Sequence, residues 1–203
     1  MSRKRLMTRL TSDSRASSDA PGHIIKAHDV ADLVFSRREV TFAIDQVAMR
    51  MAAHLYDENP LFICVLQGGF FYFSRLIERL NIPLEVSYVH VGRYGEKTIG
   101  NSELTWLAKP DVSLEDRHVV LVDDVFDKGV TMKSLVDWAW SEGASVVSSS
   151  VLISKETSKV KDAHVDFMAL HATDRFLFGC GMDYRGYWRN LPEVFALPEG
   201  FVG

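Results

Sequence analysis

One stretch near the middle of the chain, residues 118–131, constrains the fold more than any other. It reads His-Val-Val-Leu-Val-Asp-Asp-Val-Phe-Asp-Lys-Gly-Val-Thr. The part from His118 to Val122 is short, apolar and rich in β-branched residues, as is typical of a central parallel strand covered on both faces. Because charged side chains do not stay inside such a strand, Asp123 and Asp124 are predicted to mark its carboxyl end, where open α/β sheets bind ligands.

The residues after the two aspartates predict a turn that opens a helix. Gly129 permits a tight backbone turn, and Thr131 places a hydroxyl where the helix begins. Exposed backbone amides at such a position form a site suited to a phosphate. With Asp123, Asp124 and Asp127 beside it, the turn indicates a phosphorylated sugar and a divalent metal as ligands. The alternative is a strand that ends in solvated aspartates, followed by an ordinary helix start.

This stretch resembles the phosphoribosyl-diphosphate signature of type I phosphoribosyltransferases, in which two acidic residues are followed by Asp-Thr-Gly-x-Thr. Lys128 stands where threonine is commoner, so one hydroxyl contact to phosphate is lost. The resemblance still implies a phosphate cradle formed by the amides of Lys128, Gly129, Val130 and Thr131. It also implies an α/β fold with a mainly parallel sheet flanked by helices, a small hood and a flexible loop.

Length and composition fit one domain of ordinary size, since 203 residues are 47% hydrophobic and 25% charged. A formal net charge of −4 and the lack of a Lys/Arg run argue against nucleic acid or an anionic membrane as a partner. No apolar run approaches the ~20 residues needed to cross a bilayer. The two cysteines, Cys64 and Cys180, lie in apolar surroundings and indicate reduced, structural thiols of a cytoplasmic protein.

The first 21 residues differ from the rest, because serine, arginine and threonine dominate them and Pro21-Gly22 closes them. This composition predicts a disordered tail over residues 1–21 and a single phosphoribosyltransferase domain over 22–203. Arginine and serine also suggest an organellar presequence, against which Asp13 and Asp19 count.

Strands and helices are predicted to alternate through the domain, which favours a mainly parallel sheet between helix layers. Ser36 and Glu39 form a capping-box pattern before an amphipathic helix that ends near Asn59-Pro60. The other expected helices cover residues 70–80 and the segment from Thr131 to Gly143. Strands are expected at residues 61–66, 84–91, 104–107, 118–122, 145–153, 165–170 and 176–180.

Two further segments extend the resemblance to hypoxanthine–guanine phosphoribosyltransferases, over roughly residues 28–198. The segment Cys-Val-Leu-Gln-Gly-Gly-Phe resembles their pyrophosphate loop, with Gln67 where lysine is common, and implies backbone contacts at Gln67 and Gly68. The polar loop at residues 92–101 corresponds to the family's flexible loop, which closes over the reacting centre. This implies Arg93 and Tyr94 as lid residues. The third segment, residues 152–155, 174–179 and 183–184, resembles the purine-binding part.

The resemblance implies transfer of ribose 5-phosphate from phosphoribosyl diphosphate to a 6-oxopurine, which yields IMP or GMP and pyrophosphate. Asp123 and Asp124 are expected to hold the ribose hydroxyls, directly or through Mg²⁺, and Asp183 a second Mg²⁺. Asp127 is expected to face purine N7 as general base. Arg189 is expected to contact pyrophosphate, because a guanidinium matches phosphate geometry.

The purine is expected to meet four residues. Lys155 would donate to its 6-oxygen, Phe176 would stack on its ring, and Leu177 and Asp183 would meet its 2-position. Structural alternatives are a solvated Lys155, a core aromatic at Phe176, and an Arg189 that pairs with Glu193.

Other functions fit parts of the pattern. A xanthine-preferring or broader purine transferase would use the same residues, and a nucleotide-sensing RNA-binding regulator would use the same fold but needs a basic face. A phosphoacceptor receiver domain places its aspartate pair at the first strand, and a Walker-type NTPase needs a G-x-x-x-x-G-K-[ST] run that this chain lacks. A homodimer or homotetramer is expected for this class.

Overall fold

The computed structural model describes residues 21–93, 104–156 and 163–202, apart from the side chain of Arg93. The predicted tail therefore lies outside the described residues up to position 20, as does Tyr94. The elements are α2 (Gly22–Asp29), β1 (Asp32–Phe35), α3 (Arg37–Leu55), β2 (Leu61–Leu66), α4 (Phe70–Ile77), β3 (Glu85–Arg93), β4 (Leu104–Ala108), β5 (His118–Phe126), α5 (Val130–Ser141), β6 (Val146–Glu156), β7 (Phe167–Thr173), β8 (Leu177–Phe178) and β9 (Val194–Ala196).

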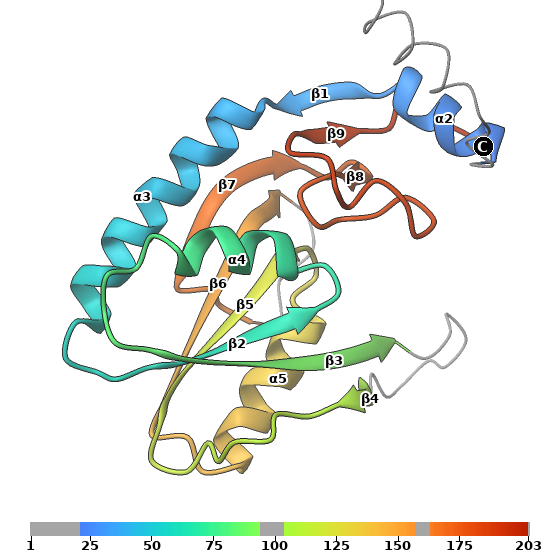
Figure 1. Ribbon diagram of the computed structural model, residues 1–203. Helices are drawn as coiled ribbons and strands as arrows, with labels where there is room; N and C mark the ends of the chain where they lie inside the picture. The colour runs from blue at the N-terminus through green and yellow to red at the C-terminus, as the bar shows by residue number, and fades with distance from the viewer. Residues whose placement is uncertain (1–20, 94–103, 157–162, 203) are drawn as a thin grey trace, which may run out of the picture.

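A six-stranded sheet in the order β4-β3-β2-β5-β6-β7 forms the centre of the molecule (Figure 1). Its neighbouring strands are parallel except for the antiparallel pair of β3 and β4. Helices α3 and α4 cover one face and α5 covers the other, so a hydrophobic core lies on each side. The predicted fold class is confirmed. No helix within the described ranges is long and apolar enough to span a bilayer.

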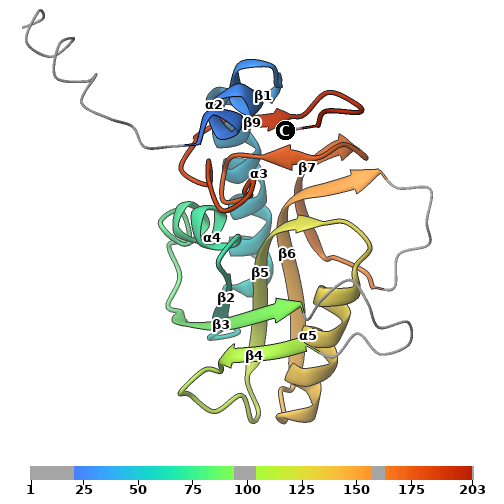
Figure 2. The same ribbon diagram turned by 90° about the vertical axis from the view of Figure 1, so that its right-hand side faces the viewer.

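A second, smaller sheet forms the hood beyond the carboxyl ends of β5, β6 and β7 (Figure 2). It consists of the antiparallel strands β1, β9 and β8, and α2 packs beside it. Its own small core contains Ile24, Ala27, Phe178, Tyr184 and Leu197. The strand predicted over residues 176–180 shortens to β8, and α2, β1 and β9 are too short for hydrophobic periodicity to reveal.

Helix α3 begins where the sequence predicts. The Ser36 hydroxyl accepts from the Glu39 amide at 3.4 Å, and Glu39 accepts from the Ser36 amide at 2.8 Å. These bonds satisfy two amides that a helix start leaves open. The Ser36 hydroxyl also donates to Oε2 of Glu39 at 2.7 Å, and this bond, together with the one from the Ser36 amide, lowers the pKa of Glu39. Helix α4 ends at Ile77 rather than at the predicted residue 80.

Strand β5 is longer than predicted, and this corrects the expectation that Asp123 and Asp124 end it. Its pairing with β2 stops at Val122, but its pairing with β6 continues through Asp123 to Phe126. Pairing with β6 therefore keeps residues 123–126 in the strand. Because β2 no longer pairs with β5 beyond Val122 and ends at Leu66, the other edge of β5 is open beside the aspartates. The charged side chains thus extend from a strand that is still held on its other edge.

Strand β6 carries buried serines at its centre. Ser148 lies 2.9 Å from Nε2 of His118, and Ser150 lies 2.7 Å from the hydroxyl of Tyr72. Each buried hydroxyl therefore has a partner, as burial requires. Burial also raises the pKa of Tyr72.

Candidate active site

The turn before α5 has the geometry that its sequence predicts. Gly129 adopts a left-handed conformation with φ of 83°, and its carbonyl accepts the first helical hydrogen bond from Lys133 at 2.8 Å. A Cβ at this position would be strained and would lie 3.0 Å from the Phe126 ring. The turn places the start of α5, the kind of position at which anions bind, next to a cavity whose wall includes Thr131.

The two adjacent aspartates differ in their surroundings. Asp123 is half-buried, whereas Asp124 is buried, and the Asp124 amide donates to Oδ1 of Asp123 at 2.9 Å. Burial raises the pKa of Asp124, while the hydrogen bond with Asp123 and the positive charge of Arg189 act in the opposite direction. Of the two aspartates, Asp124 is therefore the one whose ionised form is disfavoured by burial.

An acidic cavity of about 430 Å³ adjoins these aspartates. Its walls come from β2, β3, β4, β5, α5 and the segment after β8, and the lining residues are Val65, Leu66, Val91, Gly92, Leu104, Asp123, Asp124, Thr131, Asp183 and Arg189. The cavity thus combines three carboxylates, one guanidinium and the hydroxyl-bearing Thr131. This set can bind a ligand that carries both hydroxyls and phosphates.

Arg189 and Asp183 face each other at the edge of the acidic cavity. Nη2 of Arg189 lies 2.6 Å from Oδ1 of Asp183, and Nη1 donates to the carbonyl of Gly181 at 2.6 Å. The other oxygen of Asp183 accepts from the Gly186 amide at 2.7 Å. Arg189 is therefore paired with Asp183 and not with Glu193, the alternative considered from the sequence.

The glycine turn after β2 lies directly against the aspartate pair. The peptide bond between Leu66 and Gln67 is cis. A Cβ on Gly68 would lie 2.5 Å from Cγ of Asp124, and one on Gly69 would lie 2.7 Å from the carbonyl oxygen of Val122. Only glycine permits so close an approach of this turn to the carboxyl end of β5.

A second cavity, here called the base cavity, has a volume of about 260 Å³. It is lined by Asp124, Val125, Asp127, Lys155, Phe176, Leu177, Met182 and Asp183. Asp124 and Asp183 line both cavities, so the two spaces meet at these carboxylates. The base cavity thus combines an aromatic wall, one ammonium and three carboxylates, two of which it shares with the acidic cavity.

The structure decides two of the alternatives that the sequence left open. The side chain of Lys155 is only 13% exposed and its Nζ lies 3.5 Å from Oδ1 of Asp174, so it is not a solvated lysine. Phe176 is 52% exposed and meets Tyr184 edge to face at 5.9 Å, so it is not a core aromatic. Both side chains are available to a ligand in the base cavity.

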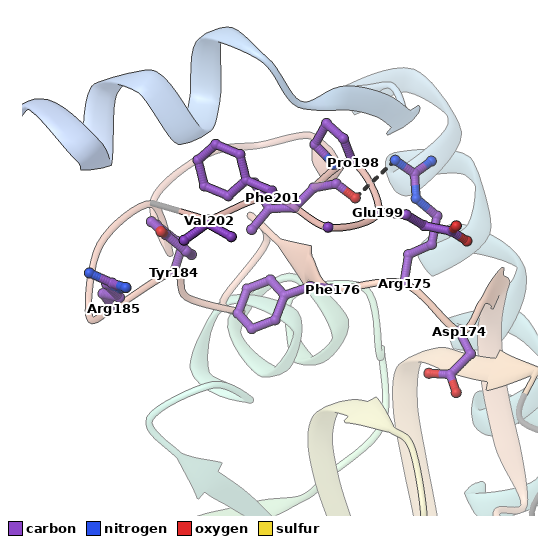
Figure 3. Close-up of a pocket in the computed structure, with 11 residues that line it drawn as sticks. Asp174, Arg175, Phe176, Tyr184, Arg185, Pro198, Glu199, Phe201 and Val202 are labelled. Atoms are coloured by element: carbon purple, nitrogen blue, oxygen red, sulfur yellow. Dashed lines mark hydrogen bonds between the residues drawn. The ribbon is translucent and has the colours of Figure 1, made fainter.

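A third cavity, of about 470 Å³, lies on the hood and has Phe176 as one wall (Figure 3). Phe201, Pro198 and Val202 line it together with Arg175, whose guanidinium donates to the carbonyl of Leu197 at 3.0 Å. Asp123, Asp124 and Asp127 do not line it. These three aspartates therefore belong to the acidic and base cavities alone.

Several residues expected at the site lie outside both cavities. The side chains of Gln67 and Lys128 are exposed, and neither they nor Val130 line the acidic or base cavity. Arg93 ends β3, beside the cavity-lining Gly92.

Sequence reasoning also missed lining residues, notably Val125 and Met182 in the base cavity and Leu104 in the acidic cavity. Val125 was detectable, because it stands midway between Asp123 and Asp127 in a strand where every second residue shares a face. Leu104 carries no such signal.

The carboxylates suit a hard cation that is bound together with a substrate. Within the described residues, no group of three or more His, Cys, Asp or Glu side chains could hold a metal by itself. Asp123, Asp124 and Asp183 instead line one cavity, and Mg²⁺ takes one or two carboxylates while it keeps waters and phosphate oxygens. The donor set therefore fits Mg²⁺ that arrives with a phosphorylated ligand.

The protein is thus an α/β protein with a mainly parallel sheet, and two joined cavities lie at the carboxyl end of β5. Residues 39–185 match the model of the phosphoribosyl transferase domain, and the chain belongs to this family.

Relatives and solved structures agree with this membership. The chain is 29% identical to the hypoxanthine-guanine phosphoribosyltransferase of Streptococcus thermophilus over 84% of its own length and 95% of the relative's. It is 29% identical to the hypoxanthine-guanine-xanthine phosphoribosyltransferase of Tritrichomonas foetus over 84% and 93%. A solved hypoxanthine phosphoribosyltransferase from Trypanosoma cruzi is 25% identical with a TM-score of 0.79, covering 84% of this chain and 97% of that one.

Proposed function

We propose that this protein is a hypoxanthine–guanine phosphoribosyltransferase of purine salvage. It transfers ribose 5-phosphate from phosphoribosyl diphosphate to hypoxanthine or guanine and releases pyrophosphate. The observation that carries the proposal is the junction of the two cavities at Asp124 and Asp183, with Asp127 on the wall of the base cavity. A sugar at this junction has a purine on one side and a diphosphate on the other.

The acidic cavity matches the charge that develops in this reaction. Breaking the bond at the anomeric carbon builds positive charge on the ribose and negative charge on the leaving diphosphate. Asp123 and Asp124 supply carboxylates for the ribose side, and Arg189 supplies a guanidinium for the diphosphate. The amides that follow Gly129, with the Thr131 hydroxyl, receive the 5-phosphate.

Asp127 is assigned the role of general base. It is half-buried and lines the base cavity close to the junction, where N7 of a bound purine loses its proton as the new bond forms. A carboxylate in this position accepts that proton directly, and its placement matters as much as its pKa.

The base cavity selects 6-oxopurines through Lys155. Its ammonium has only donors, so it pairs with a 6-oxygen but leaves itself unpaired against the 6-amino group of adenine. Phe176 stacks on the ring from one side. The backbone at Leu177 and Asp183 accepts from the 2-amino group of guanine.

The ion pair between Arg189 and Asp183 keeps both side chains at the wall of the acidic cavity, where the ligands are proposed to bind. In the absence of ligand the two charges neutralise each other at 2.6 Å. A bound diphosphate competes with Asp183 for the guanidinium, which leaves one carboxylate oxygen without its cationic partner. Mg²⁺, when bound with the substrate through Asp123, Asp124 or Asp183, supplies further positive charge at the diphosphate.

The proposal includes the setting of the enzyme. Its substrates are phosphoribosyl diphosphate and a 6-oxopurine, and it binds neither nucleic acid nor a membrane. It works in the cytoplasm as a homodimer or homotetramer. The domain extends over residues 22–203.

A broader specificity that includes xanthine is the second candidate, because one relative of equal identity is named for xanthine as well. The base cavity counts against it, since the 2-oxygen of xanthine would face the backbone acceptors at Leu177 and Asp183 where guanine presents a donor. An assay with phosphoribosyl diphosphate, Mg²⁺ and each of hypoxanthine, guanine, xanthine and adenine tests both candidates. Turnover of hypoxanthine and guanine supports the proposal, and activity with none of the four purines overturns it.

A further inference from the structure

Helix α3 lies on the outside of the molecule (Figure 1), and the exposed and buried residues along it place an apolar stripe on the side opposite its buried residues. Phe42, Met49 and Tyr56 form this stripe, with exposed fractions of 64%, 59% and 70%. They are spaced seven residues apart, so they align along one side of the helix over about 21 Å. Tyr56 follows the last helical residue, but its φ of −54° and ψ of −41° keep it on the helical path.

The stripe is not part of the core that α3 builds. The helix buries its opposite side, and the buried residues are Val40, Ala43, Ile44, Val47, Ala48, Met51 and Leu55. A helix that covers a sheet face normally presents polar residues to solvent on the other side. Three large apolar side chains in line on that side are unexpected, and contiguous exposed apolar patches mark interaction sites.

We propose that the stripe is an interface with a second copy of this chain, formed by two α3 helices packed antiparallel about a two-fold axis at Met49. The order aromatic, methionine, aromatic reads the same in both directions. A two-fold axis at the centre therefore places Met49 against Met49 of the other copy, and Phe42 against Tyr56 in both halves. Such self-complementarity is what a symmetric dimer contact requires.

The charges at the two ends of α3 favour the antiparallel arrangement. Arg37 and Arg38 begin the helix, and Asp57 and Glu58 follow its end. Antiparallel packing brings the arginines of one copy near the carboxylates of the other, whereas parallel packing would place like charges together. The helix dipoles also oppose each other favourably in the antiparallel pair.

The flanks of the stripe permit close approach. Ala53 is exposed beside the line of the three large residues and is small enough to let a second helix pack closely. Asp45 is also exposed beside it, but its carboxylate pairs with Arg79 of the same chain. Arg50 is likewise engaged, because it donates to the carbonyl of Met168 at 2.9 Å. No uncompensated charge from these two residues would be buried.

The size of the stripe predicts a modest affinity. Three large side chains supply about half of the ~800 Å² per partner that a stable interface buries. Pairing through α3 should therefore depend on protein concentration. This inference concerns a surface remote from the cavities and does not depend on the proposed function.

Sedimentation velocity over a wide concentration range tests the proposal. Met49→Glu places two carboxylates on the axis and should lower the association constant at this face at least tenfold. Leu107→Glu is the matched control, because Leu107 is 61% exposed on β4, at the other end of the molecule. It should leave association within about twofold of the unchanged protein. Circular dichroism verifies that both variants are folded.

Two variants make the two-fold axis itself testable. Mixing Met49→Glu with Met49→Lys should restore association, because opposite charges then meet on the axis. Met49→Cys should form an intermolecular disulfide on mild oxidation, and Cys64 and Cys180 are buried and do not compete. The proposal is overturned if Met49→Glu associates like the unchanged protein, if Leu107→Glu weakens association equally, or if the charge-reversed mixture stays apart.

Discussion

The main chain of Gly68 lies directly against the carboxylate of Asp124. A Cβ built on Gly68 would be 2.5 Å from Cγ and 2.9 Å from Oδ1 of that side chain. Gly68 belongs to the turn after β2, whereas Asp124 lies in strand β5, at the edge that β2 leaves open. Their contact brings the proposed pyrophosphate loop to the carboxylates that are proposed to bind the ribose.

Substitution of Gly68 by alanine should therefore damage the site more than the fold. The added methyl group forces Asp124 out of its position, and we expect a loss in kcat/KM of about 10²-fold or more. The free energy of unfolding should fall by about 1–3 kcal/mol, as is usual for overpacking. Steady-state kinetics and chemical denaturation measure the two effects.

Gly22→Ala is the matched control for this experiment. A Cβ at Gly22 meets nothing within 4 Å and needs no left-handed backbone. It should leave both activity and stability near those of the unchanged protein. If Gly68→Ala were equally active, the close approach to Asp124 would have no bearing on catalysis.

Asp127→Asn tests the assignment of the general base. Asparagine keeps the size of the side chain but cannot accept the purine proton, so kcat should fall by about 10²-fold or more. The thermal midpoint should stay unchanged, because Asp127 is only half-buried. Asp137→Asn, on the exposed side of α5 in a pair with Lys133, is the control. Turnover equal to that of the control would remove Asp127 from the mechanism.

Lys155 should affect the binding of the purine and not that of phosphoribosyl diphosphate. Lys155→Met keeps most of the side-chain volume but removes the ammonium, so the 6-oxygen loses its donor. We expect KM for hypoxanthine to rise about tenfold or more, while KM for phosphoribosyl diphosphate changes less than about twofold. Asp174→Asn removes only the partner of Lys155 and should have a smaller effect of the same kind. Equal damage to both substrates would indicate a structural role for Lys155.

The strands and helices with strong periodicity could be predicted from the sequence because burial dictates their pattern. Strand β2 and helix α3 begin where the sequence indicates, the first as an apolar run and the second at the Ser36 capping box. The length of β5 could not be predicted, because the aspartates interrupt its apolar run while β6 still pairs with it. The short elements of the hood are stabilised by tertiary contacts, such as the bond from Trp188 Nε1 to the Ile24 carbonyl at 2.9 Å.

The parts of the site that lie within one sequence motif could be predicted. The parts that form only when separate segments fold together could not. Asp123, Asp124 and Thr131 lie in one motif, so their proximity follows from the chain itself. The meeting of Asp183 with Arg189 depends on how the segment between β8 and β9 folds back on itself, and the closeness of Gly68 to Asp124 depends on how the turn after β2 packs against β5. No spacing in the sequence encodes either contact.

Both cysteines should resist thiol reagents in the folded protein. Burial, reinforced by the charges of Asp123 and Asp124, raises the pKa of Cys64 to about 12, and burial raises that of Cys180 to about 12. At pH 8 only about one thiol in 10⁴ would be ionised and reactive. Titration with an aromatic disulfide should therefore detect no thiol in the native protein and two in denaturant. Rapid reaction of one native thiol would show that its site opens to solvent.

Asp124→Asn should stabilise the protein at neutral pH while it impairs catalysis. Burial raises the pKa of Asp124 in the folded state above the ~3.9 of an unfolded aspartate. Between those two values the folded state binds more protons, so its stability falls as pH rises, and the loss is complete above the folded pKa. Asparagine cannot ionise and avoids this loss.

The thermal midpoint of Asp124→Asn should thus exceed that of the unchanged protein at pH 7.5, and the difference should shrink as the pH falls below about 4, where both side chains are neutral. Asp111→Asn, at an exposed aspartate, should show no such pH-dependent gain. A midpoint for Asp124→Asn that is lower at pH 7.5 would mean that the bonds and the Arg189 charge around this carboxylate outweigh its burial. Together with the expected loss of turnover, a higher midpoint would show that the enzyme keeps a destabilising buried carboxyl because the ribose requires it.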